Sequence, residues 1–176
     1  VGSLRRDSFN RKLAHGLARL APHGFTFKLV EIGDLPLYNQ DDDAAPADAV
    51  KRFKAEIKAA AGVVFVTPEY NRSVPGVLKN AIDIGSRPYG HSVFAGKPGA
   101  VVTVSPGAIG GFGANHHLRQ SLVFLDVPAM PQPEAYIGSA ADLFDADGKV
   151  KNETTRGFLQ KFIDTYAAWV EANLRA

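Results

Sequence analysis

The chain has 176 residues, 45% apolar and 22% charged, which is ordinary for one globular domain covering residues 1–176. Its 20 basic and 18 acidic residues form no basic stripe, which argues against a nucleic-acid partner. No apolar run approaches the ~18 residues that cross a bilayer, so we expect no membrane span. The absence of cysteine excludes disulfides and thiolate metal sites and is consistent with a cytoplasmic location.

The chain begins with a polar loop that leads into a helix. Apolar residues from Phe9 to Leu20 recur with helical spacing, which predicts a helix starting near Ser8 and ending before Pro22. Apolar and polar side chains then alternate in "FTFKLVEI", which predicts a strand over residues 25–32 with at least one buried face.

Helices and strands continue to alternate through the middle of the chain. A Pro- and Asp-rich loop over residues 33–46 precedes a helix around residues 50–61. Residues 62–67 form a short apolar run that is typical of a parallel strand covered on both faces. Pro75 suits the first turn of a further helix, and residues 100–104 repeat the buried-strand pattern.

The last third predicts a helix over about 111–125, a brief strand at 127–130, and a final helix that Asn152 caps. Strands alternating with helices are typical of a parallel sheet with helices on both faces. Ligands of such sheets bind beyond the carboxyl ends of the strands, so the loops that follow the strands are the candidate site.

The first candidate loop is "GSLRRDSFN" at residues 2–10. Unpaired N–H groups and the dipole of the following helix favour an anion there, with short polar side chains and Arg5 as further donors. Its spacing matches neither a nucleoside-triphosphate loop nor a dinucleotide-binding turn. A capped helix start with solvated arginines remains the alternative.

Two later loops add to the pattern. The "PEYN" tetrapeptide after the strand at 62–67 presents a carboxylate, an aromatic ring and an amide, and it can offer backbone groups to a planar heterocycle. The "SPGAIGGFG" loop from residue 105 permits close backbone approach to a ligand. Each loop taken alone also fits a purely structural turn.

Together, "GSLRRDSFN" and "PEYNRSVPGVLKNAID" resemble the NADPH-dependent FMN reductase family, in particular its quinone and chromate reductase branch. The later stretches "GAIGG" and "HLRQSLVFLD" are similar to that branch too. The resemblance spans nearly the whole chain. It implies a flavodoxin-like three-layer sandwich with a five-stranded parallel sheet in the order 2-1-3-4-5 and helices on both faces.

The resemblance further implies that FMN is the cofactor and that NAD(P)H is the co-substrate. The residues expected around the 5′-phosphate are Ser3, Arg5, Ser8 and Asn10. Those expected along the isoalloxazine ring are Pro68, Glu69, Tyr70, Asn71, Ser105 and Gly107. Subunits of the family assemble as homodimers or homotetramers, with the flavin near a subunit boundary. In the family an apolar strand precedes "GSLR", so this numbering is expected to omit most of a central first strand.

The implied function is FMN-dependent transfer of hydride from NAD(P)H to quinones or similar electron-poor acceptors, such as azo compounds, chromate or free flavin. One shared site predicts ping-pong kinetics. The cofactor carries the chemistry, so we assign no catalytic side chain and no metal. A non-enzymatic, flavodoxin-like electron carrier is the alternative, although such carriers are typically very acidic and this chain has a net charge of +2. A flavin-free α/β binding module is a third possibility.

Overall fold

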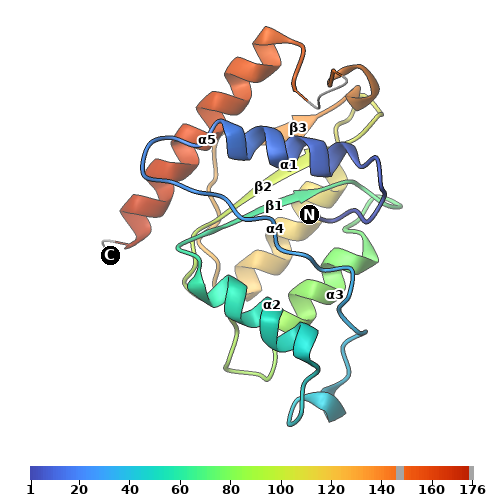
Figure 1. Cartoon of the computed structure of the whole chain (residues 1–176), viewed down its shortest axis with the longest axis vertical. Helices are drawn as coiled ribbons and strands as arrows, with labels where there is room; N and C mark the ends of the chain where they lie inside the picture. Colours follow the sequence, from blue (N-terminus) through green and yellow to red (C-terminus); the bar gives the residue numbers. More distant parts are fainter. Residues whose placement is uncertain (146–148, 175–176) are drawn as a thin grey trace.

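A computed structural model describes residues 1–145 and 149–174. Three parallel strands form its sheet in the order β1 (Val63–Thr67), β2 (Gly99–Val104) and β3 (Ala135–Ile137). The helices are α1 (Phe9–Arg19), α2 (Asp48–Ala59), α3 (Gly76–Gly85), α4 (Phe112–Phe124) and α5 (Glu153–Leu174), with short 3-10 helices at Gln40–Asp42 and Ala140–Asp142. From β1 onward strands and helices alternate along the chain, as the sequence predicts, whereas α1 and α2 follow one another with no strand between them (Figure 1).

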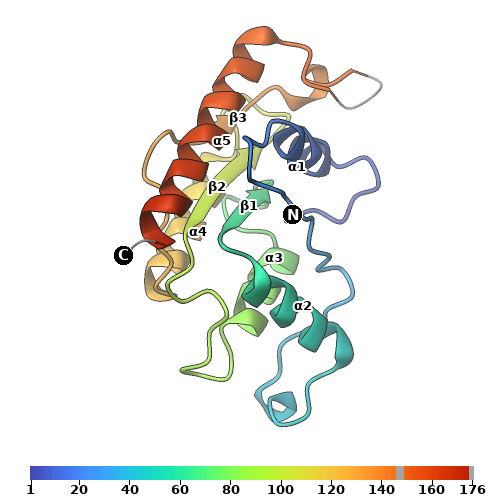
Figure 2. The same ribbon diagram turned by 60° about the vertical axis from the view of Figure 1, so that its left-hand side comes forward.

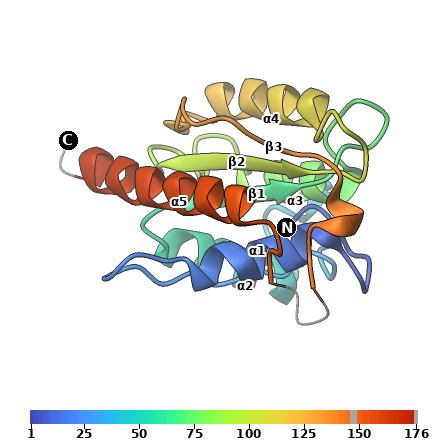
Figure 3. The same cartoon turned by 90° about the horizontal axis from the view of Figure 1, so that it is seen from above.

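The sheet separates two apolar cores, because side chains of a strand alternate between its faces. Val66 and Val102 pack with α1 and α5 on one face, whereas Phe65 and Val101 pack with residues of α2, α3 and α4 on the other. Figure 3 shows α4 and α5 on opposite sides of β2, and α2 lies beside α3 in Figures 1 and 2. All of β2 is buried, as predicted for a central parallel strand.

The helix starts follow the polar residues that the sequence indicates. Ser8 caps α1 by accepting the Arg11 N–H at 3.2 Å, and the Asn152 side chain accepts the Thr155 N–H at 2.9 Å at the start of α5. Pro75 precedes α3 as its N-cap residue instead of occupying its first turn. The predicted helices are therefore confirmed, with α2 ending at Ala59, before the predicted residue 61.

Of the four strands that the sequence predicts within this numbering, two are not strands in the described chain, whose sheet has three strands and not the five that the resemblance implies. Residues 127–130 make single contacts with β2, in which Gly99 donates to Pro128 and accepts from Met130, and β3 forms further along at Ala135–Ile137. Residues 25–32 are extended and keep their alternating burial, yet they have no hydrogen-bonded neighbour strand. A strand needs a partner for its backbone N–H and C=O groups, and sequence periodicity does not supply one.

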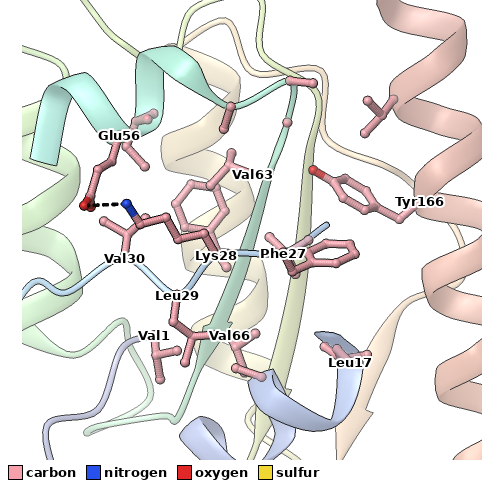
Figure 4. A pocket seen from close by; sticks show the side chains of 18 of the residues that line it. Val1, Leu17, Phe27, Lys28, Leu29, Val30, Glu56, Val63, Val66 and Tyr166 are labelled. Atoms are coloured by element: carbon pink, nitrogen blue, oxygen red, sulfur yellow. Dashed lines mark ion pairs between the residues drawn. The ribbon is translucent and has the colours of Figure 1, made fainter. Parts of the chain in front are cut away.

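An apolar groove of about 620 Å³ separates residues 25–32 from β1. Figure 4 shows lining residues of the groove from three segments, with Phe27 and Leu29 from residues 25–32, Val63 and Val66 from β1, and Tyr166 from α5. The edge of β1 that faces the groove has no strand beside it in the described chain. The groove therefore lies where the resemblance expects the first strand of a five-stranded sheet.

Within the described part of the chain, no helix is long and apolar enough to cross a membrane. The stretch "DADGKVKNE" that begins at Asp145, whose glycine position favours a surface turn over a calcium loop, includes residues 146–148, which lie outside the described residues.

Candidate functional site

The three candidate loops meet at the carboxyl ends of β1 and β2. The Gly2 N–H donates to the Val66 carbonyl at 2.8 Å, which holds the first loop against the end of β1. The Asn10 amide donates to the Val104 carbonyl at 3.3 Å, which ties the start of α1 to the last residue of β2. One edge of the sheet therefore carries the loops that the sequence singles out.

In the first loop, Ser3, Ser8 and Asn10 are buried and Arg5 is exposed. The Ser8 hydroxyl caps α1, and the Arg5 guanidinium lies 5.8 Å from the centre of the Phe9 ring. This loop leads into the amino end of α1. A helix leaves its first four N–H groups without intrahelical partners, so donors of α1 lie next to the loop. This arrangement suits an anion, as predicted, and it also includes the helix cap that was the structural alternative.

The second loop forms a tight turn over Tyr70–Ser73. Tyr70 and Ser73 exchange two backbone hydrogen bonds of 3.0 and 2.9 Å, while Asn71 and Arg72 adopt left-handed φ angles of 50° and 65°. Such a turn exposes its central backbone groups and costs energy in a residue such as arginine. Tyr70 is 50% exposed, so its ring does not simply pack into the protein.

The Glu69 carboxylate has two partners, one in this turn and one in α4. One carboxylate oxygen accepts the Ala114 N–H at 3.1 Å, and the other accepts from the Arg72 guanidinium at 3.1 Å. Both carboxylate oxygens therefore have partners within the protein, and the Glu69 side chain is only 11% exposed. The structure thus places Glu69 between the second loop and the start of α4.

The third loop is shaped by backbone conformations that favour glycine. Gly110 and Gly111 have φ angles of 66° and 79°, and a Cβ on Gly110 would lie 2.7 Å from the Tyr136 carbonyl carbon. Ser105 donates its N–H to the Ile137 carbonyl at 2.9 Å, and its hydroxyl accepts the Gly107 N–H at 3.1 Å. Gly107 is exposed at the mouth of the loop.

An aromatic group beside the third loop was not predicted. The His116 ring lies 4.3 Å from the Phe112 ring and its Nε2 is 2.9 Å from the Tyr136 hydroxyl. Burial and the nearby Glu134 carboxylate raise the pKa of Tyr136 to about 12. The sequence motifs do not predict this aromatic group, because Tyr136 lies on β3 whereas Phe112 and His116 lie on α4.

The polar groups at this edge fit the tail of a phosphorylated cofactor. The Asn10 Oδ1 atom is buried and has no hydrogen-bond partner, which leaves an acceptor for a hydroxyl group. Hydroxyl side chains and helix N–H groups around it are neutral donors for a phosphate. Among residues 1–145 and 149–174, no group of three or more His, Cys, Asp or Glu side chains could hold a metal ion.

Comparison with known proteins agrees with this geometry. Residues 1–142 match the family described as NADPH-dependent FMN reductase. A quinone reductase of Pseudomonas putida is 66% identical over 98% of this chain and 93% of its own length, and a 2-hydroxy-1,4-benzoquinone reductase of a Burkholderia species is 55% identical over 97% and 93%. The solved structure of FerB, a flavoenzyme NAD(P)H:(acceptor) oxidoreductase from Paracoccus denitrificans, superimposes with a TM-score of 0.92 at 46% identity, covering 98% of this chain and 94% of FerB.

Proposed function

This chain belongs to the NADPH-dependent FMN reductase family, and we propose that it reduces quinones with bound FMN and NAD(P)H. It is an FMN- and NAD(P)H-dependent oxidoreductase with a flavodoxin-like α/β fold, as the sequence motifs predict. Bound FMN would supply the hydride chemistry between the nicotinamide and the acceptor, and the residues of this chain would hold and orient it. The observation that carries the choice of quinones is the 66% and 55% identity to two quinone reductases over nearly the full chain.

We assign the phosphate of FMN to the first loop, with Ser3, Arg5, Ser8 and Asn10 around it. Two of these residues have a structural task as well, since Ser8 caps α1 and Asn10 reaches β2. A phosphate at this position would meet the N–H groups and dipole of α1, which stabilise an anion by about 0.3–1 kcal/mol. Arg5 would supply the compensating positive charge.

We assign the flavin ring to the second and third loops, with Pro68, Glu69, Tyr70, Asn71, Ser105 and Gly107 along it. Glu69 would contribute its backbone only, because its carboxylate is engaged by Arg72 and Ala114. Backbone N–H groups held in a rigid turn stabilise negative charge that develops on a bound ligand without having to reorganise. Hydride transfer requires no acid–base side chain here, so none is assigned a catalytic role.

A kinetic experiment tests this function. Initial rates with NADPH and a benzoquinone varied together are expected to give parallel double-reciprocal lines, because both substrates would use one site in turn. Intersecting lines would contradict the ping-pong scheme. A panel that adds an azo dye, chromate and free FMN defines the acceptor range, and turnover of none of these acceptors would favour a flavodoxin-like carrier that passes electrons to a protein.

We also propose that an extended apolar segment fills the groove between residues 25–32 and β1. The groove is lined by Leu29 and Val66 among other apolar side chains, and no strand pairs with β1 along it in the described chain. A strand there would pair β1 and also residues 25–32, which already alternate in burial. The sheet would then have the five-stranded order 2-1-3-4-5, with residues 127–130 or β3 at its far edge.

We further propose that the enzyme is a cytoplasmic homodimer or homotetramer. Val123 and Phe124 at the end of α4 are 79% and 73% exposed, beside a groove of about 510 Å³ between α3 and α4. Adjacent large apolar side chains exposed on one helix suit an interface between copies of a chain. The cytoplasm holds NAD(P)H, and the chain contains no cysteine that would need an oxidising compartment.

A further inference from the structure

The Tyr70–Ser73 turn is held from outside by α4. Its two central residues have positive φ angles, which asparagine adopts readily but which strain a residue such as Arg72. Neither central residue is glycine, so the conformation requires contacts elsewhere to maintain it. Besides its own Tyr70–Ser73 hydrogen bonds, the turn has contacts with a helix that begins about 40 residues later in the chain.

Three neighbouring positions of α4 contact the turn segment. The Ala114 N–H donates to Glu69 at 3.1 Å, and the His117 Nδ1 lies 3.0 Å from the Ser73 hydroxyl. Gly113, the residue before Ala114, lies so close to the turn that a Cβ on it would be 2.8 Å from the Arg72 carbonyl oxygen. The turn is therefore packed directly on the first turn of α4.

The Glu69 side chain contacts both the turn and the start of α4. The N-cap residue of α4, Gly111, has no side chain to accept a helix N–H, and the Glu69 carboxylate performs that task from another loop. Its second oxygen binds the guanidinium of Arg72, the central residue with the larger positive φ. One side chain therefore caps the helix and stabilises the strained turn.

We propose that Glu69 is a positioning residue that clamps the Tyr70–Ser73 turn to the amino end of α4 and thereby presents the turn's backbone to the flavin. The clamp rests on the proposed assignment of the flavin ring to this turn. The negative charge of Glu69 is balanced by the helix terminus and by Arg72, so its effect on the cofactor passes through the turn. Glu69 itself needs no contact with the ring.

Three variants separate this clamp from a direct contact. Glu69→Ala removes both contacts and is expected to weaken FMN binding about tenfold, because the released turn samples other conformations and must be ordered again when the flavin binds. Glu69→Gln keeps an oxygen for the Ala114 N–H but loses the ion pair with Arg72, so its FMN dissociation constant should lie between those of wild type and Glu69→Ala. Adding Arg72→Gly to Glu69→Ala should restore most of the binding, because glycine adopts a positive φ without strain.

The matched control is Glu153→Ala. Glu153 pairs with Arg156 at the same i,i+3 spacing, but it lies at the start of α5 outside the site. This variant should bind FMN like wild type. Gly113→Ala tests the same contact from the helix side, since its Cβ would lie 2.8 Å from the Arg72 carbonyl oxygen and 2.9 Å from the Glu69 carboxylate, and it should weaken FMN binding without removing any charge.

The experiment measures the FMN dissociation constant by fluorescence quenching, and amide hydrogen exchange of Tyr70 and Ser73 in the apoprotein. Faster exchange in Glu69→Ala together with rescue by Arg72→Gly supports the clamp. Unchanged exchange in Glu69→Ala overturns it, and so does a Glu69→Gln variant that binds FMN as poorly as Glu69→Ala. If wild type binds no FMN, the proposed function fails, while the exchange data still decide whether Glu69 holds the turn.

Discussion

Gly2 lies against the end of β1 so closely that a Cβ would be 2.3 Å from the Thr67 hydroxyl oxygen. We predict that Gly2→Ala destabilises the protein by about 1–3 kcal/mol, the usual cost of overpacking, and weakens FMN binding by displacing the first loop. Urea unfolding and FMN titration measure the two effects. The control is Gly16→Ala in α1, where a Cβ meets nothing within 4 Å and should stabilise by about 0.5–1 kcal/mol. Equal effects of the two variants would contradict the close approach.

Tyr136 gives a prediction for alkaline pH. Its pKa is raised to about 12, whereas the phenol of an unfolded chain ionises near 10. Between these values the unfolded state loses the proton first, so ionisation favours unfolding and stability falls as the pH rises above 10. We expect Tyr136→Phe to lose less stability than wild type between pH 9 and 11 in urea unfolding. Parallel losses would show that this phenol titrates normally.

At the scale of elements, the caps of α1 and α5 form a matched pair. Ser8 and Asn152 each accept a backbone N–H of their own helix, at 3.2 and 2.9 Å. Replacing either by alanine is expected to cost about 1 kcal/mol of stability. Ser8→Ala should also weaken FMN binding, whereas Asn152→Ala should leave it unchanged. Thermal unfolding and flavin titration decide this, and an equal effect of both variants on FMN would remove Ser8 from the cofactor site.

Helices were easier to predict from this sequence than strands, for a physical reason. A helix satisfies its backbone within one segment, so the spacing of Leu13 and Leu17 and the cap at Ser8 sufficed to locate α1. A strand depends on neighbours that periodicity does not reveal. Residues 25–32 alternate correctly but have no partner strand, and β3 formed at Ala135–Ile137 beside β2 instead of at 127–130.

The candidate site likewise has one part that the sequence predicts, the three loops, and one part that it does not, the contacts between distant side chains. The motifs placed three loops at one edge of the sheet because parallel strands end together there. They did not reveal that Glu69 faces Ala114, or that Tyr136 meets His116, since these contacts join segments far apart in the chain. The side-chain roles that the sequence could not supply are those created by tertiary packing.

At the scale of the whole molecule, the question is whether a further strand or solvent occupies the groove beside β1. In a chain that carries the proposed strand, Leu29→Asp should lower the free energy of unfolding by at least ~2 kcal/mol, because a charge would face a buried apolar neighbour. Thr26→Asp on the exposed side of the same segment should change it by less than ~0.5 kcal/mol. Denaturant unfolding compares the two, and a tolerated Leu29→Asp would mean that solvent fills the groove.

The proposed interface between copies is tested by Phe124→Asp. Placing a charge on this exposed apolar surface should shift the molar mass measured by light scattering toward that of a single chain. The control is Leu37→Asp, which alters an equally exposed leucine in the loop before α2. An unchanged mass for Phe124→Asp would place the interface elsewhere.

Anaerobic stopped-flow absorbance of the FMN-loaded enzyme is the most direct test of the whole account. Mixing with NADPH should bleach the flavin band near ~450 nm, and a second mix with a benzoquinone should restore it in a single turnover. A band that NADPH leaves intact over many seconds, or a bleached band that quinone fails to restore, would contradict the assignment of both half-reactions to this site.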